Sequence, residues 1–343
     1  MLIAELFQHR QFRLAQSSIP ADPPPGQVQV AVKAIGVCGS DLHVFSEGGI
    51  GDTRCVYPAV LGHEPSGVVV KAGSGVTGWS AGDRAVLEPA LYCYHCEFCM
   101  SGRHNVCANL RFMSLADEPG FFRELVNVPV ANLLPLPNSL SYAEGALVEP
   151  LAVIVHSMQF AAPRPGNTAV VFGAGPIGLL TIALLKLSGV SRIWAVEPVA
   201  HRRELAVAMG ASAALDPSDD PARQILNDTA KRGVDIAIDC ATQGESTNQC
   251  IRAACNAGRV VVTGVPSEIQ MHLDFHVLRR KELAFYSVRR SNHDSGTALR
   301  LLANDARRFA PVLTHERPLS GIQAAFELCE RRTDGVGKLT ITV

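Results

Sequence analysis

Residues 169–178 read AVVFGAGPIG, and this stretch decides the fold of the second half of the chain. Its first four residues are apolar and suit a buried strand, and a helix-like run follows from Ile177 to Ser188. Between them, Gly173 to Gly178 has the spacing G-x-G-x-x-G, which is informative only where it joins a strand to a helix, as it does here. The sequence therefore predicts the first strand–turn–helix unit of a dinucleotide-binding domain.

Each glycine of the turn has a different physical role. Gly173 allows the tight turn, Gly175 lets the backbone approach a pyrophosphate, and Gly178 allows close packing of the helix on the strand. Pro176 and Ile177 stand between the last two glycines and open the helix. We expect all five residues to line the binding site for the cofactor.

A carboxylate stands where such domains bind the cofactor ribose. Glu197 lies nineteen residues past Gly178, at the end of the next predicted strand, 192–197. A carboxylate there accepts hydrogen bonds from ribose hydroxyls and repels a 2′-phosphate, so NAD is favoured over NADP. Arg202 keeps NADP open as the alternative, because a nearby arginine can accommodate that phosphate.

The alternation of strands and helices continues outward from this turn. A helix-like run, 201–210, and strand-like runs at 234–239 and 259–263 follow, and they predict a parallel, doubly wound (Rossmann) sheet over 151–285. Residues 1–150 are instead rich in Gly and Pro with short alternating runs, which is typical of an all-β, barrel-like domain. The predicted fold class is α/β, with one domain of each kind.

The composition argues against several other classes of protein. Of the 343 residues, 47% are hydrophobic and 18% are charged, so we expect a sizeable core and no long disorder. The formal net charge of -1, without a block of like charges, argues against a nucleic-acid-binding surface.

The sequence also argues against export and membrane insertion. Glu5, His9 and Arg10 interrupt the N-terminal segment, so this segment is not a signal peptide. A buried strand and helix explain the uncharged run 165–185 better than a membrane span, and we expect a cytoplasmic protein with no membrane partner.

Four of the ten cysteines lie within fifteen residues, with the spacing C-x2-C-x2-C-x7-C: Cys93, Cys96, Cys99 and Cys107. Because the chain shows no export signal, clustered thiols indicate a metal rather than disulfides. Four thiolates suit a closed, structural zinc site, and an iron–sulfur cluster is the rival because ferredoxins have similar spacings. Ala108 favours zinc, since ferredoxin-like runs usually have proline at that position.

A second set of metal ligands is spread over the first 150 residues. Cys38, His63 and Glu149 offer a thiolate, an imidazole and a carboxylate, which together suit catalytic zinc with one open position. Glu149 is the only charge in the apolar run 145–155, and a dication beside it would explain its place there. The alternative is that Glu149 begins a helix and faces solvent. Asp41 is expected to make structural hydrogen bonds only.

These motifs, in this order, resemble the zinc-dependent medium-chain dehydrogenase family over essentially the whole chain. The resemblance rests on Cys38-Gly-Ser-Asp, Gly62-His63-Glu64, the four-cysteine lobe, Glu149-Pro150 and the turn 173–178. The chain is most similar to the sorbitol (polyol) dehydrogenases and their sugar-acid relatives, since the alcohol dehydrogenases of the family have Cys where this chain has Glu149. The resemblance implies that Glu64 ligates the catalytic zinc while Glu149 holds the bound water, or the reverse.

The resemblance also implies an activity and a domain arrangement. The catalytic domain is expected to comprise 1–150 and 286–343, with the nucleotide-binding domain inserted and the active site in the cleft between them. The implied reaction is the reversible oxidation of a secondary hydroxyl of a polyol or sugar acid to the ketone, with zinc and NAD as cofactors. The proton is expected to pass from Ser40 through the cofactor ribose to His43, whose ordinary pKa of about 6.5 suits this step. A homodimer or homotetramer is implied as well.

The substrate contacts and the rival functions stay open. Arg289 or Arg290 aligns with a substrate-contacting arginine of the polyol dehydrogenases, and either could pair with a carboxylate or hydrogen-bond a hydroxyl. The alternative is a solvent-facing basic turn. A threonine or simple alcohol dehydrogenase is a rival enzyme, and a non-catalytic dinucleotide-binding protein is a rival of another class. The last would usually have lost a zinc ligand, and none of the expected ligands is missing here.

Overall fold

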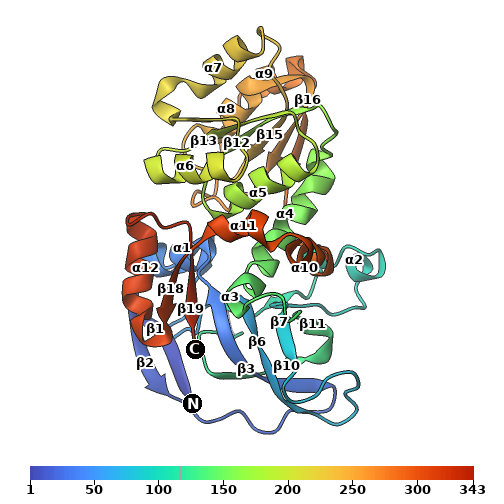
Figure 1. Cartoon of the computed structure of the whole chain (residues 1–343), viewed down its shortest axis with the longest axis vertical. Coiled ribbons are helices and arrows are strands. Elements are labelled where there is room, and N and C mark those ends of the chain that lie inside the picture. Colours follow the sequence, from blue (N-terminus) through green and yellow to red (C-terminus); the bar gives the residue numbers. More distant parts are fainter. Residues whose placement is uncertain (116–117) are drawn as a thin grey trace. The chain divides into compact units, whose positions relative to one another are not determined.

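The computed structural model describes residues 1–115 and 118–343, and the chain divides into two units (Figure 1). Unit 1 comprises Met1–Ala152, Asn292–Ala306 and Leu313–Val343. Unit 2 comprises Val153–Ser291 and Arg307–Val312. The chain therefore leaves unit 1 once for a long excursion, and its last strand returns to the unit in which the chain began.

A mixed seven-stranded sheet forms the frame of unit 1. The strand order is β11-β7-β6-β3-β19-β18, and β10 pairs with β3 beside this path. Strand β18 is parallel to β19, and the other pairs are antiparallel. The strands are β3 (Gln27–Gly36), β6 (Glu64–Ala72), β7 (Arg84–Leu87), β10 (Leu125–Pro129), β11 (Leu133–Pro135), β18 (Leu313–Pro318) and β19 (Lys338–Thr342).

Strand β3 shows why this sheet forms. Its residues alternate between buried and half-buried positions, with Val28, Val30 and Val32 on the buried face, as the two-residue period of a strand requires. The core beneath includes the rings of Phe12, Phe45 and Phe326, whose centroids are 4.6 to 5.8 Å apart.

Short strand pairs and helices complete unit 1. The pairs are β1 (Leu2–Gln8) with β2 (Gln11–Gln16), β4 (Gly49–Ile50) with β5 (Thr53–Arg54), and β8 (Ala90–Leu91) with β9 (Arg111–Phe112). The helices are α1 (Gly39–Glu47), α2 (Glu97–Met100), α3 (Tyr142–Gly145), α10 (Ser295–Asn304) and α12 (Ile322–Arg331). Helix α4 (Val148–Ala161) begins in unit 1 and continues in unit 2.

Unit 2 contains a six-stranded, all-parallel sheet in the order β14-β13-β12-β15-β16-β17. Numbered within the unit this order is 3-2-1-4-5-6, that of a doubly wound dinucleotide-binding fold. The strands are β12 (Thr168–Phe172), β13 (Arg192–Val196), β14 (Ala213–Leu215), β15 (Val234–Asp239), β16 (Ala254–Val262) and β17 (Ala284–Ser287). The predicted fold class, a barrel-like β domain and a Rossmann domain, is confirmed.

Helices cover both faces of the parallel sheet. In Figure 1, α5 (Pro176–Leu187) and α6 (Ala200–Ala208) lie on one side, and α7 (Pro221–Asp228), α8 (Ser246–Ala253) and α9 (Phe275–Arg280) lie on the other. The short α11 (Ala306–Phe309) follows later in the chain. The uncharged run 165–185 is thus β12 and most of α5, as predicted. Within the described residues, no helix is both long and apolar enough to cross a membrane.

Candidate active site

Three potential metal ligands from two separate parts of unit 1 lie close together. The sulfur of Cys38, an imidazole nitrogen of His63 and a carboxylate oxygen of Glu64 lie within 4.8 Å of one another. Cys38 caps the N-terminus of α1, and Glu64 is the first residue of β6. His63 and Glu64 are buried, and Cys38 is half-buried. The fold thus brings together a thiol, an imidazole and a carboxylate.

This donor set fits a divalent cation. Oε1 of Glu64 is buried, and it has no hydrogen-bond partner among the described residues. A buried carboxylate oxygen needs a cation, a proton or a donor. Burial opposes protonation of His63, but the charges of Asp41 and Cys38 outweigh it and raise the pKa of the imidazole well above its ordinary value. Both observations indicate that the cluster attracts positive charge.

Asp41, for which the sequence predicts only structural hydrogen bonds, contacts this cluster directly. Its Oδ2 accepts from the backbone N–H of Cys38 at 3.2 Å. Its Oδ1 accepts from the N–H of Gly62 at 3.3 Å and from the hydroxyl of Ser114 at 3.2 Å. The same oxygen lies 3.3 Å from Nδ1 of His63, an ion-pair contact outside hydrogen-bond geometry. Asp41 therefore holds the backbone beside one ligand and the ring of the other, as outer-shell carboxylates of metal sites do.

Lys338 is a site residue that sequence reasoning missed. It lies on β19 and is 2% exposed, and its ammonium forms an ion pair with Oε2 of Glu64. Burial lowers the pKa of Lys338, but Glu64, Cys38 and Glu149 together raise it above its ordinary value, so the side chain stays charged. A signal was present in the sequence. Lys338 is the only charged side chain in the run 337–343, and, like Glu149, it needs a compensating charge nearby if it is buried.

Gly36 makes room for this ion pair. It pairs with Glu64 on β6 and with Thr340 on β19, so it lies between the strands that carry the two charges. A Cβ atom at this position would lie 1.9 Å from Oε2 of Glu64 and 2.8 Å from Cε of Lys338. Only glycine leaves the pair in its observed place.

The structure places Glu149 near the cluster but outside its innermost group. It lies in the first turn of α4, is half-buried, and is not one of the three ligands within 4.8 Å. Its charge nevertheless contributes to the raised pKa of Lys338. Glu64 is therefore the carboxylate that the structure groups with Cys38 and His63.

The two residues predicted to carry the proton both lie on α1. Ser40 Oγ is 3.4 Å from Nε2 of His63, at the metal-binding cluster. His43 follows three residues later, and residues at this spacing share a helix face. Nδ1 of His43 lies 2.9 Å from Oε1 of Glu47, a contact that was not predicted from the sequence.

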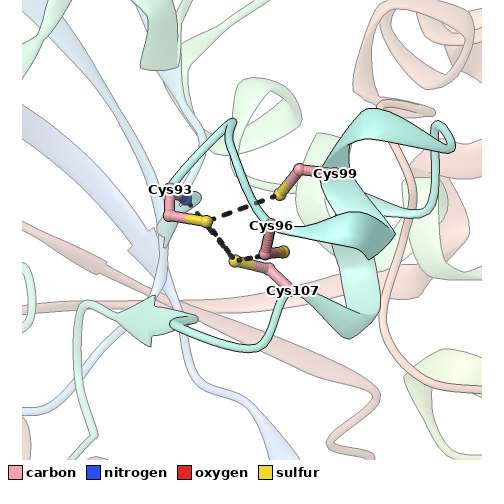
Figure 2. Close-up of side chains that lie close together, drawn as sticks. All are labelled: Cys93, Cys96, Cys99 and Cys107. Carbon is pink, nitrogen blue, oxygen red and sulfur yellow. Dashed lines mark hydrogen bonds between the residues drawn. The ribbon is translucent and has the colours of Figure 1, made fainter.

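The four cysteines form a compact cluster in the lobe that contains α2 (Figure 2). The sulfur of Cys93 is 3.4 Å from that of Cys107 and 4.0 Å from that of Cys99, and the sulfurs of Cys96 and Cys107 are 3.9 Å apart. Four sulfurs at about 2.3 Å from one tetrahedral zinc ion would be about 3.8 Å apart. Cysteines that each bind a different iron of a cluster would lie further apart, so the geometry favours a single ion.

The thiols of this lobe differ in their readiness to ionise. Backbone N–H groups, first that of His95 and then that of Cys96, lower the pKa of Cys93 to about 5. Desolvation raises the pKa of Cys99 to about 12. A metal ion therefore displaces a proton more readily from Cys93 than from Cys99.

In unit 2, the glycine-rich turn joins β12 to α5. Gly173 has φ of 88°, and a Cβ there would lie 2.9 Å from the nitrogen of Ala241. A Cβ at Gly178 would lie 1.8 Å from the carbonyl oxygen of Gly173. At Gly175, the N-cap of α5, the nearest atom to such a Cβ would be Nη1 of Arg202 at 3.8 Å. Pro176 and Ile177 form the first turn of the helix, and the backbone N–H groups of such a helix N-terminus suit a phosphate.

Glu197 follows β13 and is 3% exposed. Its Oε2 accepts from the N–H of Ala174 at 2.8 Å, and its Oε1 accepts from the N–H of Val199 at 3.1 Å. The carboxylate thus braces the glycine-rich turn. Arg202 lies beside the same turn, close to Gly175.

Other polar groups stand at the same edge of this sheet, the carboxyl ends of its parallel strands, where such folds bind ligands. Arg289 and Arg290 follow the end of β17. Arg289 is exposed, and Arg290 is half-buried with a positive φ of 54°. The chain therefore holds one of the two arginines in a conformation that non-glycine residues seldom adopt.

Two known protein domains match this chain. Residues 24–138 match the alcohol dehydrogenase GroES-like domain, and residues 176–304 match the zinc-binding dehydrogenase domain. A probable D-xylulose reductase A of Emericella nidulans is 36% identical over 90% of this chain and 88% of its own. The sorbitol dehydrogenase of Bacillus subtilis is 30% identical over 95% of this chain and 93% of its own length.

A sugar-acid enzyme and a solved structure are similar along the whole chain. The 2-dehydro-3-deoxy-L-galactonate 5-dehydrogenase of Pseudoalteromonas atlantica is 30% identical over 99% of this chain and 98% of its own. A zinc-binding dehydrogenase of Sinorhizobium meliloti, solved with NADP bound, superposes with a TM-score of 0.92 at 29% identity and covers 100% of this chain and 99% of that chain.

Proposed function

Because the chain belongs to the zinc-binding dehydrogenase family and is an oxidoreductase, we propose that it oxidises a secondary hydroxyl of a polyol or sugar acid to the ketone, reversibly and with NAD. The cluster of Cys38, His63 and Glu64 carries the proposal, because its thiol, imidazole and carboxylate suit a catalytic zinc ion with an open position. The relatives named for a ketose, a polyol and a sugar acid support the substrate class.

The buried charges support a divalent ion at this cluster. Cys38 as a thiolate, Asp41, Glu64 and Glu149 bring four negative charges, and Lys338 brings one positive charge. Buried charges need compensation, and a dication reduces the net charge of this group from -3 to -1. Cys38, His63 and Glu64 would hold the ion, and Glu149 would hold the water or hydroxyl at the open position.

When bound, zinc supplies Lewis acidity, which makes a coordinated hydroxyl a stronger acid. The protein residues then orient the substrate and remove its proton. Asp41 holds the ring of His63, and Lys338 holds Glu64. Ser40, beside the cluster, is the first group to accept the proton of the substrate hydroxyl, through a hydrogen bond. His43, on the same helix face, then releases this proton to water. Glu47, beside Nδ1 of His43, would accept that N–H and leave Nε2 free to bind the proton.

Glu197 supports NAD rather than NADP. Two backbone N–H groups hold its carboxylate in place at the end of β13, so its negative charge is fixed where a 2′-phosphate would lie. Arg202 beside the turn works in the opposite direction, and a solved relative binds NADP. We infer that the fixed carboxylate dominates, because it is buried and two backbone hydrogen bonds hold it in place.

The experiment is NAD reduction by the purified protein across polyols, aldonic acids, threonine and simple alcohols, with and without a strong zinc chelator. A chelator-sensitive rate on a polyol or aldonate is the expected result. A preference for aldonates would indicate that Arg289 or Arg290 pairs with a carboxylate. A rate confined to threonine or simple alcohols would refute the proposed substrate class, and a chelator-resistant rate would refute the role of zinc.

A further inference from the structure

Asn292 is the residue at which the chain re-enters unit 1, and its side chain is hydrogen-bonded to the four-cysteine lobe. Its Oδ1 accepts from the backbone N–H groups of His104 at 2.9 Å and Asn105 at 3.4 Å. Its Nδ2 donates to the carbonyl of Gly102 at 2.8 Å. The side chain thus uses both its acceptor oxygen and its donor nitrogen on one turn of the lobe.

The turn that Asn292 contacts belongs to the four-cysteine lobe. It lies between Cys99 and Cys107, and the N–H of Cys107 donates to the carbonyl of His104 at 2.9 Å. A metal ion bound by these cysteines therefore also restrains the turn to which Asn292 is hydrogen-bonded. Any increase in the mobility of the four-thiolate site would be transmitted to Asn292 through this turn.

Ring contacts reinforce the attachment. The ring of His293 packs edge-on against that of His104, with centroids 4.2 Å apart. Tyr92, just before the first cysteine, packs against both rings at 5.3 and 5.6 Å. Asn292 and His293 are thus bound to the lobe by hydrogen bonds and by packing.

The backbone around this attachment is held in an uncommon conformation. Arg290 has φ of 54° and His293 has φ of 62°, and both are non-glycine residues. Such conformations persist where surrounding contacts impose them, and they cluster at functional sites. The chain passes from unit 2 to unit 1 between Ser291 and Asn292, so the attachment lies at the point of return.

We propose that Asn292 is a positioning residue through which the four-thiolate site fixes the conformation of Arg289 and Arg290. The lobe holds Asn292 and His293, and the two arginines are only two and three residues before Asn292. The lobe metal then contributes to substrate binding without touching the substrate. The substrate role of the arginines rests on the proposed function, whereas the attachment itself does not.

The test compares Asn292→Ala with a matched control, Asn127→Ala. Asn127 lies on β10 of the same unit, and its Nδ2 donates to the carbonyl of Ala21 at 2.9 Å, outside the lobe. Hydrogen–deuterium exchange of peptides covering 285–295 is measured first, in protein with its metals bound. Exchange in this segment should rise about tenfold in Asn292→Ala and stay unchanged in Asn127→Ala.

Kinetics then separate positioning from a general loss of structure. The KM for the best polyol or aldonate should rise about tenfold in Asn292→Ala, while kcat and the KM for NAD stay within about twofold. Asn292→Asp keeps the acceptor and loses the donor, so it should give an intermediate rise, and it carries the test if the alanine variant does not fold. An equal loss of kcat in all variants, or an unchanged substrate KM, would overturn the proposal.

The two hypotheses fail in different ways. Unchanged exchange in Asn292→Ala would overturn the attachment whatever the enzyme oxidises. If the wild-type protein oxidised none of the substrates, the proposed function would fail on its own test, and the exchange experiment would still decide whether the lobe fixes this segment.

Discussion

Gly36→Ala is the substitution that tests the metal-binding cluster most specifically. The added methyl carbon would lie 1.9 Å from Oε2 of Glu64 and 2.8 Å from Cε of Lys338. Since carbon atoms do not approach such neighbours within 3.0 Å, the carboxylate must move by at least about 1 Å. The side chains of Lys338 and Glu64 are 2% and 0% exposed, so neither charge can turn into water.

The magnitude follows from the burial of this ion pair. Breaking a buried pair costs about 3–5 kcal/mol when one charge is left uncompensated. A displaced Glu64 would also leave the proposed metal ion with only two of its three protein ligands. We therefore expect Gly36→Ala to lose several kcal/mol of unfolding free energy, to keep one metal ion per chain in the four-cysteine lobe, and to have no measurable turnover.

The assay combines elemental analysis, urea unfolding and NAD reduction. Gly296→Ala is the control, because a Cβ there meets nothing nearer than 3.6 Å and the residue lies in α10, where alanine should stabilise by up to about 1 kcal/mol. A Gly36→Ala protein with two metals per chain and normal turnover would refute the description of this ion pair.

Three further predictions concern other charges. In Lys338→Met, Glu64 loses the ammonium of Lys338 as its ion-pair partner, so the metal-free protein should be less stable while zinc binds more tightly; a competition titration with a chelator should show this, and an unchanged zinc affinity would contradict it. In Glu197→Ala, the ratio of kcat/KM for NADP to that for NAD should rise about tenfold or more, and an unaltered ratio would remove Glu197 from cofactor selection. Burial raises the pKa of Asp235, but hydrogen bonds from Arg232 and Thr168 outweigh it and hold that pKa below its ordinary value of 3.8. Because the folded-state pKa is the lower one, this stabilisation is complete above about pH 4 and is lost as the pH falls through the folded-state value. Asp235→Asn should therefore lose about 1–2 kcal/mol of unfolding free energy at neutral pH, and its unfolding free energy should fall less steeply with acidification than that of the wild type. An equal acid dependence in the two proteins would contradict the assignment.

Local patterns predicted the second unit well. The predicted strand 169–172 and helix 177–188 differ by about one residue from β12 and α5, because apolar periodicity and a glycine turn determine both. The clustering of the four cysteines was equally predictable. They lie within fifteen residues of one another, so their proximity does not depend on the rest of the fold.

Long-range pairing explains what could not be predicted. That β19 joins the sheet of β3 was implied by family resemblance and not by any local pattern, and the ion pair between Lys338 and Glu64 depends on it. The need for glycine at Gly36 appears only when β6 and β19 are placed on its two sides. Asn292 likewise looks like an ordinary loop residue until the lobe, almost two hundred residues earlier, is placed beside it.

The most direct test of the central claim is to measure metal content and polyol or aldonate oxidation together in the wild-type protein, in His63→Ala and in Cys107→Ser. We predict two zinc ions per chain and a chelator-sensitive rate for the wild type. His63→Ala should retain one ion and no rate, and Cys107→Ser should lose the other ion while keeping the catalytic one. A His63→Ala protein that oxidises the substrate at the wild-type rate would contradict the assignment of Cys38, His63 and Glu64 as the catalytic metal site.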